Sequence, residues 1–184
     1  MPIYALGDAI AHVHPRAFVH PQATLIGEVH VGSGASIWPG VVIRADNGPI
    51  VIGARTSIQD GSVLHTQHLL PTVIGAGCVV GHLAHLEGCV LEDHVLVGSG
   101  AVVLEGAVLR AVSFVAAAAL VRPHTEVPSG AMAIGVPATL REGVVTLDMI
   151  EGNARAYELH IVQHRDGMRA VEPASCITED VRAP

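Results

Sequence analysis

Residues 58–89, which read IQDGSVLHTQHLLPTVIGAGCVVGHLAHLEGC, decide the fold of this chain. Aliphatic residues recur in this stretch at a spacing of six, as at Ile58 and Leu64 and again at Ile74 and Val80. The stretch also contains four histidines and two acidic residues. It therefore combines a repeating scaffold with side chains that metal sites and acid–base chemistry use.

The six-residue step continues in both directions from this stretch. It lengthens by three residues near 47–49 and by four near 66–72, and it shortens by one between Leu86 and Leu91. The aliphatic series is Val31, Ile37, Ile43, Ile52, Ile58, Leu64, Ile74, Val80, Leu86, Leu91, Val97, Val103, Leu109, Val115, Val121 and Val127. Small or β-branched residues recur four positions after it, at Ala35, Thr56, Ser62, Cys78, Ala84, Ala101, Ala107, Ser113 and Ala119.

This repeat predicts an all-β domain with a C-terminal helix, in which residues 1–140 form a left-handed parallel β-helix. Each hexapeptide makes one short strand and a corner, and three hexapeptides make a triangular coil. The aliphatic and small residues point inward. We expect the glycines that often follow the aliphatic position to allow the tight corners.

A second pattern begins after Val127, where the six-residue step lapses. Apolar residues then recur at intervals of three and four, which predicts one amphipathic helix over roughly 146–165, packed on the outside of the coils. This helix and a polar tail make up the expected second unit, 141–184. The apolar series is Leu147, Ile150, Ala154, Tyr157 and Ile161.

Composition limits the possible partners. The formal net charge is −7 and there is no basic run, so we expect no nucleic-acid partner. No apolar stretch is long enough to span a bilayer, and the N-terminus has no signal-peptide pattern.

The odd set of cysteines, Cys78, Cys89 and Cys176, suits a reducing cytoplasm. We interpret Cys78 as a core residue.

Counting coils places candidate functional residues in two columns. Residues one coil apart stack about 4.8 Å from each other. Arg44, His65 and Glu87 should form one outward column, and Asp60 and His82 a second one on a neighbouring side. A joint site for His65 and His82 would then lie between subunits, as three-fold packing of such prisms allows.

Five segments resemble the γ-class carbonic anhydrase-like hexapeptide proteins, over roughly residues 10–165. The resemblance implies a homotrimer with a divalent metal between subunits, usually zinc, held by two histidines of one chain and one of the next. The segments are VIRADN (42–47), SIQDGSVLH (57–65), VVGHLAHLEGC (79–89), VLVGSGAVVLEGAV (95–108) and AIGVPA (133–138).

By this resemblance, His65 and His82 match two metal ligands, and the third ligand position is occupied by Glu87. Iron or cobalt would suit such a set as well as zinc. His85, expected at a corner, is an alternative third ligand, and His68 lies in a loop near the site. The remaining histidines are interpreted as surface residues: His12, His14, His20, His30, His94, His124, His160 and His164.

The resemblance also implies polar residues around the metal. Arg44 and Asp46 are expected to form an ion pair between subunits, although the family's intervening glycine is Ala45 here. Asp60 is expected to accept the spare N–H of His82. Two further residues are Gln59, which would contact a bound water or the substrate, and Tyr157, which would reach the site from the helix. Plain hydrogen bonding at the interface is the other reading for Gln59 and Asp60.

The function implied is CO2 hydration by a metal-bound hydroxide at a trimer interface, a lyase reaction on CO2 or bicarbonate. The anionic Glu87 would lower the effective charge of the metal, so the activity should be weak. Three alternatives stay open: a hydrolase acting on an acyl thioester, a coenzyme A-dependent acyltransferase, and a non-catalytic trimeric binding module.

Overall fold

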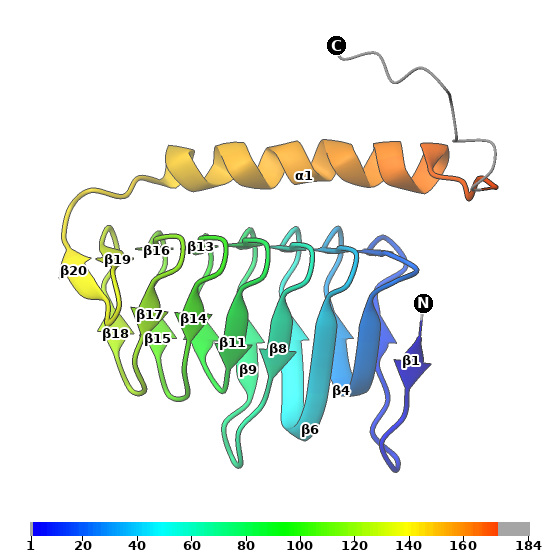
Figure 1. Cartoon of the computed structure of the whole chain (residues 1–184), viewed down its shortest axis with the longest axis horizontal. Coiled ribbons are helices and arrows are strands. Elements are labelled where there is room, and N and C mark those ends of the chain that lie inside the picture. Colours follow the sequence, from blue (N-terminus) through cyan, green and yellow to red (C-terminus); the bar gives the residue numbers. More distant parts are fainter. Residues whose placement is uncertain (1, 173–184) are drawn as a thin grey trace.

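The chain folds into a triangular prism of stacked coils, with one long helix lying along it (Figure 1). The computed structural model describes residues 2–172. Within this range the coils form a left-handed parallel β-helix of about seven turns, as the six-residue step predicts. Cys176 and the end of the polar tail lie outside the described residues.

Two faces of the prism share one sheet, which has 12 strands within residues 2–172. The sheet is continuous because β4 (Thr24–Val31) and β6 (Val42–Ile52) each contribute to both faces. The first face also holds β1 (Ile3–Tyr4), β8 (Val63–His65), β11 (His85–Glu87), β14 (Val102–Val103) and β17 (Leu120–Val121). The second face holds β2 (His12–Val13), β9 (Thr72–Ile74), β12 (Val90–Leu91), β15 (Val108–Leu109) and β18 (Glu126–Val127).

The third face is a separate sheet with 8 strands in the described chain. Its last parallel strand, β19, keeps the register of the coils, with Met132 opposite Phe114. The prediction that the repeat lapses after Val127 was therefore wrong by one strand. The strands are β3 (Phe18–Val19), β5 (Ser36–Ile37), β7 (Ser57–Ile58), β10 (Val79–Val80), β13 (Leu96–Val97), β16 (Phe114–Val115), β19 (Met132–Ile134) and the antiparallel β20 (Thr139–Arg141).

The interior of the prism consists of the residues that the sequence pattern singled out. Every member of the aliphatic series from Val31 to Val127 is buried, and so are all the small residues four positions later. Small polar residues in the interior bond to the next coil. The Thr56 hydroxyl donates to the Gly75 carbonyl at 2.7 Å, and the Ser62 hydroxyl donates to the Gly81 carbonyl at 2.9 Å. These bonds offset the cost of burying hydroxyl groups.

Glycine is required after the aliphatic positions for a different reason from the one predicted. Gly53 and Gly81 do not have positive φ angles. A Cβ on Gly81 would lie 2.6 Å from the backbone nitrogen of Ser99 on the next coil, and a Cβ on Gly53 would be even closer to Gly75. These glycines are required by the close approach of successive coils rather than by the corner conformation.

The predicted amphipathic helix is confirmed as α1 (Leu147–Gly167), which contacts β5 and β10 of the third face. Its buried side chains are Ile150, Ala154 and Ile161. No helix within residues 2–172 combines the length and apolar character that crossing a membrane requires. The helix runs along nearly the whole stack of coils (Figure 1).

Trp38, directly after β5, holds the helix to the coils. Its indole Nε1 donates to the hydroxyls of Ser36 and Ser57, at 3.0 Å each. Its ring packs edge-on against Tyr157 and His164 of α1, with centroids 5.5 Å and 5.1 Å away. The sequence thus places its one tryptophan where a large apolar surface and a donor are both needed.

Candidate functional site

The first face carries the predicted column of Arg44, His65 and Glu87. In the register, Arg44 lies opposite His65 on the neighbouring strand, and His65 lies opposite Glu87 on the next. All three follow a buried core residue, so their side chains point outward. The coil count from the sequence therefore placed these residues correctly.

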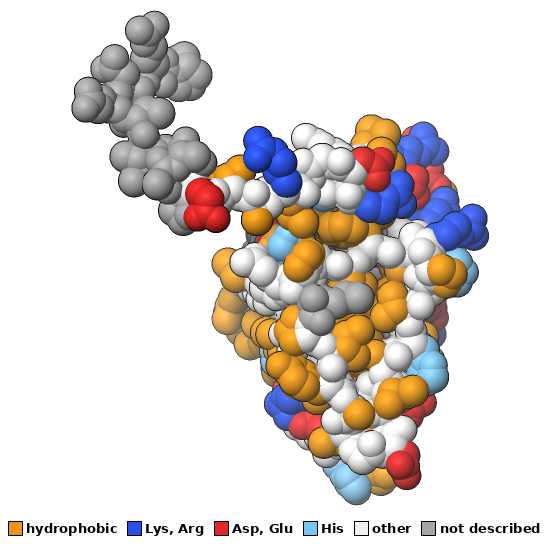
Figure 2. Space-filling view, turned by 90° about the vertical axis from the view of Figure 1, so that its right-hand side faces the viewer, with side chains coloured by type: hydrophobic (Ala, Val, Ile, Leu, Met, Phe, Trp, Pro, Cys, Tyr) orange, Lys and Arg blue, Asp and Glu red, His pale blue; other side chains and the backbone are white. Residues whose placement is uncertain are grey.

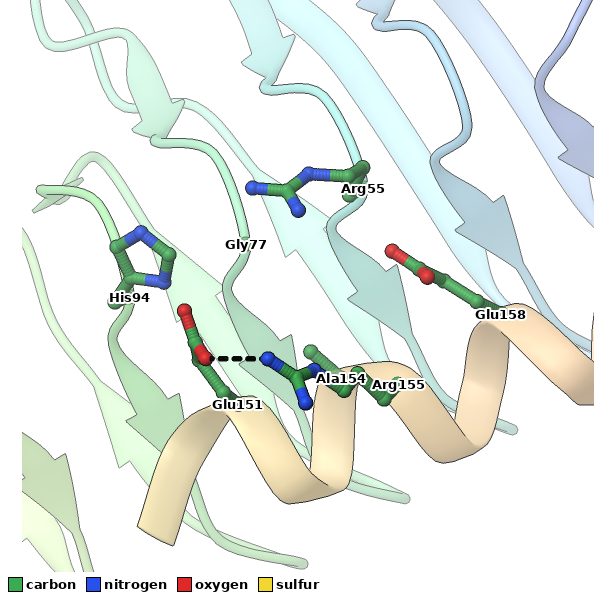
Figure 3. Close-up of a pocket in the computed structure, with 7 residues that line it drawn as sticks. All are labelled: Arg55, Gly77, His94, Glu151, Ala154, Arg155 and Glu158. Atoms are coloured by element: carbon green, nitrogen blue, oxygen red, sulfur yellow. Dashed lines mark hydrogen bonds and ion pairs between the residues drawn. The ribbon is translucent and has the colours of Figure 1, made fainter. Parts of the chain in front are cut away.

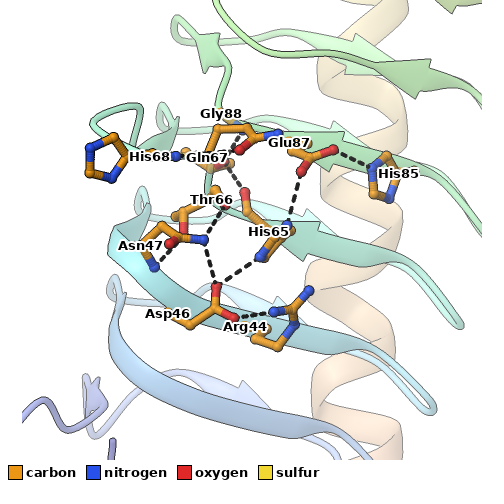
Figure 4. A network of polar contacts seen from close by, with 11 residues as sticks. Arg44, Asp46, Asn47, His65, Thr66, Gln67, His68, His85, Glu87 and Gly88 are labelled. Carbon is orange, nitrogen blue, oxygen red and sulfur yellow. Dashed lines mark hydrogen bonds and ion pairs between the residues drawn. The ribbon is translucent and has the colours of Figure 1, made fainter.

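His65 lies between two carboxylates (Figure 4). Its Nδ1 is 3.0 Å from Oε1 of Glu87, and its Nε2 is 2.7 Å from Oδ1 of Asp46. A neutral imidazole can donate through only one of its nitrogens, so a proton on each nitrogen would satisfy both contacts. A metal ion on His65 would take the place of one of them.

Both carboxylates beside His65 have lowered pKa values. Burial opposes ionisation of Asp46, but the hydrogen bond from His65 and the Arg44 charge outweigh it and lower the pKa of Asp46. Burial likewise opposes ionisation of Glu87, and the hydrogen bonds from His65 and His85 outweigh it, so the pKa of Glu87 is lowered too. At neutral pH the column thus presents anionic carboxylate oxygens, which can serve as metal ligands.

Arg44 is paired with Asp46, the residue expected, but within one chain. Its guanidinium bonds to Asp46 of the same chain, two residues along β6, so the pair does not require a second subunit. Side chains alternate between the two faces along a strand, and positions i and i+2 therefore share a face.

Asn47 was not recognised from the sequence as part of the site. Its side-chain amide donates to Asp46 Oδ1 and to the Thr66 carbonyl, at 3.2 Å each, and its backbone N–H donates to the Thr66 hydroxyl at 3.0 Å. These bonds connect the two places where the six-residue step lengthens. The insertions near 47–49 and 66–72 therefore meet beside His65; the spacing shows where each insertion lies, although not that the two meet.

His85 lies closer to the column than predicted. It is the first residue of β11 rather than a corner residue, and its Nε2 is 3.3 Å from Oε2 of Glu87. His85 and Glu87 share the outward face for the same two-residue reason. His68 is exposed in the loop before Leu69, and its backbone N–H donates to the Gln67 side chain at 3.4 Å.

The second predicted column, Asp60 and His82, lies at the corner between the third and first faces. His82 Nδ1 is 3.1 Å from Oδ2 of Asp60, and both side chains are 46% exposed. The Tyr157 hydroxyl of α1 reaches the other ring nitrogen of His82, at 3.3 Å. Burial, followed by the charge of Asp60, raises the pKa of Tyr157. Gln59 precedes Asp60 and is buried.

The two columns are built on different sheets. His82 follows β10 of the third face, whereas His65 and Glu87 end β8 and β11 of the first face. Within residues 2–172, no group of three or more histidine, cysteine or acidic side chains is arranged to hold a metal ion. The donor types nevertheless fit zinc, because two imidazoles and one carboxylate are a known catalytic set.

Several histidines interpreted as surface residues are packed into the structure. His20 is buried, its Nδ1 accepts the Gln22 N–H at 3.1 Å and its Nε2 lies 3.2 Å from Sδ of Met168. Nδ1 of His94 and Nδ1 of His164 are also buried. The docking of the amphipathic helix α1 against the coils explains the burial of His20 on the coils and of Nδ1 of His164 on the helix.

Comparison with known proteins gives matches along most of the chain. The family model described as bacterial transferase hexapeptide (six repeats) matches residues 10–45 and 71–105. Gamma carbonic anhydrase 1, mitochondrial, of Arabidopsis thaliana is 44% identical over 137 residues, 71% of this chain and 50% of the relative. The chain thus spans about half the length of this plant relative and of a second one, Gamma carbonic anhydrase 2.

Two other comparisons cover nearly the whole of the matched protein. Carnitine operon protein CaiE of Salmonella agona is 32% identical over 182 residues, 98% of this chain and 92% of the relative. The crystal structure of a hexapeptide transferase family protein from Anaplasma phagocytophilum superposes with a TM-score of 0.82 and 32% identity, covering 87% of this chain and 96% of that one.

Proposed function

Since the chain belongs to the hexapeptide-repeat, left-handed β-helix family that includes the γ-carbonic anhydrases and CaiE, we propose that it is a metal-dependent protein of the carbonic anhydrase type. We propose further that it is a homotrimer whose metal sites lie between subunits. Its substrate is CO2 or bicarbonate, its activity is weak, and its compartment is the cytoplasm. The free, buried thiols of Cys78 and Cys89 are compatible with that reducing compartment.

One observation carries the proposal: the donors are divided between two faces of the prism. His65 and Glu87 point outward from the first face, and His82 points outward at the corner of the third face. Neither set is complete by itself. A second copy packed against the first face would bring its own His82 toward His65 and Glu87, and three-fold symmetry would repeat the site three times.

The residues of this chain have distinct tasks in such a site. A bound divalent metal such as zinc supplies a Lewis acid for CO2 hydration. His65, Glu87 and the His82 of the neighbouring copy would hold it. Oδ2 of Asp60 lies 3.1 Å from Nδ1 of His82 and would accept a hydrogen bond from it in the site, which would fix the tautomer and leave Nε2 for the metal. Tyr157, which contacts that Nε2, would turn its hydroxyl toward the substrate side.

Glu87 explains why the activity should be weak. Its lowered pKa keeps it anionic, and an anionic ligand reduces the effective charge of the metal more than a neutral histidine does. Asp46 adds a second carboxylate next to His65, at 2.7 Å. Both groups make the site less able to acidify water.

A second candidate function rests on the pair of Asp60 and His82. A histidine oriented by a carboxylate at 3.1 Å and 46% exposed is arranged as a general base. Structural similarity to a putative acetyltransferase from Bacillus cereus, at 29% identity and a TM-score of 0.80, supports acyl chemistry, as an acyl or thioester hydrolase or a coenzyme A-dependent acyltransferase. In this reading His65 and Glu87 stabilise the subunit contact only.

The proposal is tested by metal analysis of protein purified without chelators or metal-affinity resin. We expect about one zinc, iron or cobalt per chain, lost in Glu87→Ala and kept in Glu142→Ala, an exposed glutamate remote from the column. Metal retained in Glu87→Ala would show that His85 or water, rather than Glu87, completes the site. No metal in the native protein, even after incubation with zinc, would leave the acyl chemistry or a non-catalytic trimer.

The intersubunit arrangement has its own test, complementation between inactive subunits. His65→Ala and His82→Ala each remove one half of the site. If His65 and His82 of one site come from different subunits, refolding the two variants together should restore about a quarter of the metal sites. About one interface in four then joins a subunit with native His65 to a subunit with native His82. A site built within one chain would gain nothing from mixing.

A further inference from the structure

A groove lined by arginines follows the flank of α1 that lies away from Tyr157 and His82. It is at the corner between the second and third faces, has a volume of ≈ 420 Å³, and is separate from both columns. The space-filling view shows several basic side chains, with acidic ones among them, at the upper right of the molecule (Figure 2). We call it the arginine groove, and Arg16, Arg55, Arg165, Glu158 and Ile161 line it.

The charge of this groove contrasts with the rest of the molecule. The chain has a net charge of −7, yet three arginines and one glutamate line the groove. Some arginines elsewhere are neutralised locally, as Arg110 is by Glu92 at 2.8 Å and by Glu126 at 2.9 Å. Within residues 2–172, the guanidinium groups of Arg16 and Arg55 have no ion-pair partner, and Arg165 pairs only with its neighbour Asp166.

The backbone leaves space around Arg55. It occupies a corner position with φ of 57°, between Gly34 on the preceding coil and Gly77 on the following coil. An L-residue in this conformation costs roughly 1 kcal/mol relative to glycine, and the two glycine neighbours place no side chains beside the guanidinium. Arg55 extends along the coils toward Gly77 and His94, and Glu158 of α1 lies on the other side of its backbone (Figure 3).

We propose that the arginine groove binds a small organic phosphate that carries hydroxyl groups, such as a nucleotide or a sugar phosphate. Guanidinium groups match phosphate oxygens in bidentate geometry, and unpaired ones gain most from an anion. Glu158 accepts hydrogen bonds from the ligand's hydroxyl groups, and Ile161 supplies an apolar wall. The volume suits a ligand of this size.

The experiment is calorimetric titration of the full-length protein with ADP, ribose 5-phosphate and inorganic phosphate. We expect one ADP per chain, with affinity falling as salt rises. Arg16→Gln and Arg55→Gln should each weaken ADP binding about tenfold or more. Arg122→Gln, an exposed arginine after β17, is the matched control and should change nothing.

Glu158→Gln separates hydroxyl recognition from simple attraction of anions. The variant should bind inorganic phosphate more tightly, because a repelling charge is removed, and ADP more weakly, because an acceptor becomes a poorer one. Equal tightening for both ligands would overturn the hydroxyl specificity. Absence of saturable binding of ADP and ribose 5-phosphate, or unchanged affinity in Arg16→Gln and Arg55→Gln, would overturn the site itself.

Discussion

His65 and Glu87 lie on adjacent coils with Nδ1 of the imidazole 3.0 Å from Oε1 of the carboxylate. The contact follows from the register, which sets the two residues opposite each other in β8 and β11. It means that the acidic residue at this position is part of the column rather than a surface substitution. Its replacement should therefore change both metal chemistry and local packing.

Glu87→His should raise CO2 hydration. A neutral imidazole in place of the carboxylate leaves more positive charge on the metal, and each unit by which the pKa of a bound water falls corresponds to about a tenfold change in its ionisation. The measurement is stopped-flow hydration with a pH indicator, normalised to metal content, with Glu142→His as control. A fully metal-loaded variant with an unchanged rate would contradict the role given to Glu87.

Trp38 and Tyr157 should differ sharply in their effect on stability. Trp38→Ala removes the ring on which α1 packs and both hydroxyl bonds, and large-to-small changes of this kind cost about 3–5 kcal/mol. Tyr157→Phe removes one exposed hydroxyl contact and should cost about 1 kcal/mol or less. Urea unfolding of the two variants at one protein concentration measures both. Similar losses in the two would show that Trp38 does not hold the helix.

The buried cysteines should be chemically inert in the folded protein. Burial raises the pKa of Cys78 and of Cys89 to about 12, so neither is a thiolate at neutral pH. Iodoacetamide at pH 8 should label them only after denaturation, as peptide mass spectrometry would show. Labelling of Cys89 in native protein at the rate of a free thiol would refute this.

The same thiols make the protein less stable at high pH. Their folded-state pKa lies above the unfolded value of about 8.5, so the folded state holds its protons longer. This contribution is complete below about pH 8.5 and is lost as pH rises toward 12. Cys89→Ala should flatten the decline of unfolding free energy over that range. The chain contains no lysine, so few other side chains titrate there.

His20 should make stability fall in mild acid. Burial, and then the charge of His164, lower the pKa of His20, whereas the charge of Asp60 raises it more weakly. A depressed folded-state pKa contributes stability above the unfolded value of about 6.5, and the contribution disappears as pH falls through the folded value. His20→Gln should reduce the loss of unfolding free energy between pH 7 and pH 5. His124→Gln, which changes an exposed histidine, should not.

The sequence predicted the prism because its core is periodic. Each aliphatic position repeats the same environment, so counting sixes placed Ile58 and Leu64 in the core and set His65 beside Glu87. The helix was equally clear from the spacing of Ile150, Ala154 and Ile161. These features depend on local periods, which a single sequence contains.

The parts that the sequence did not predict depend on contacts between distant segments. Asn47 meets Thr66 because two insertions fold toward each other, and His20 is buried because α1 returns along the coils. Neither of these two contacts corresponds to a fixed number of residues in the sequence. His85 was misplaced for a different reason: the six-residue count marks only the aliphatic positions, whereas the strand begins one residue earlier, at His85 in β11 as at Val63 in β8.

The length of α1 has a consequence for how such a protein can change in size. Its 21 residues span about 31 Å, which is the height of roughly six coil spacings of about 4.8 Å. The length of the helix thus corresponds to the height of the stack of coils. Gain or loss of one coil would shift its far end by about three helical residues, so relatives with more or fewer coils should show helices that lengthen or shorten in step.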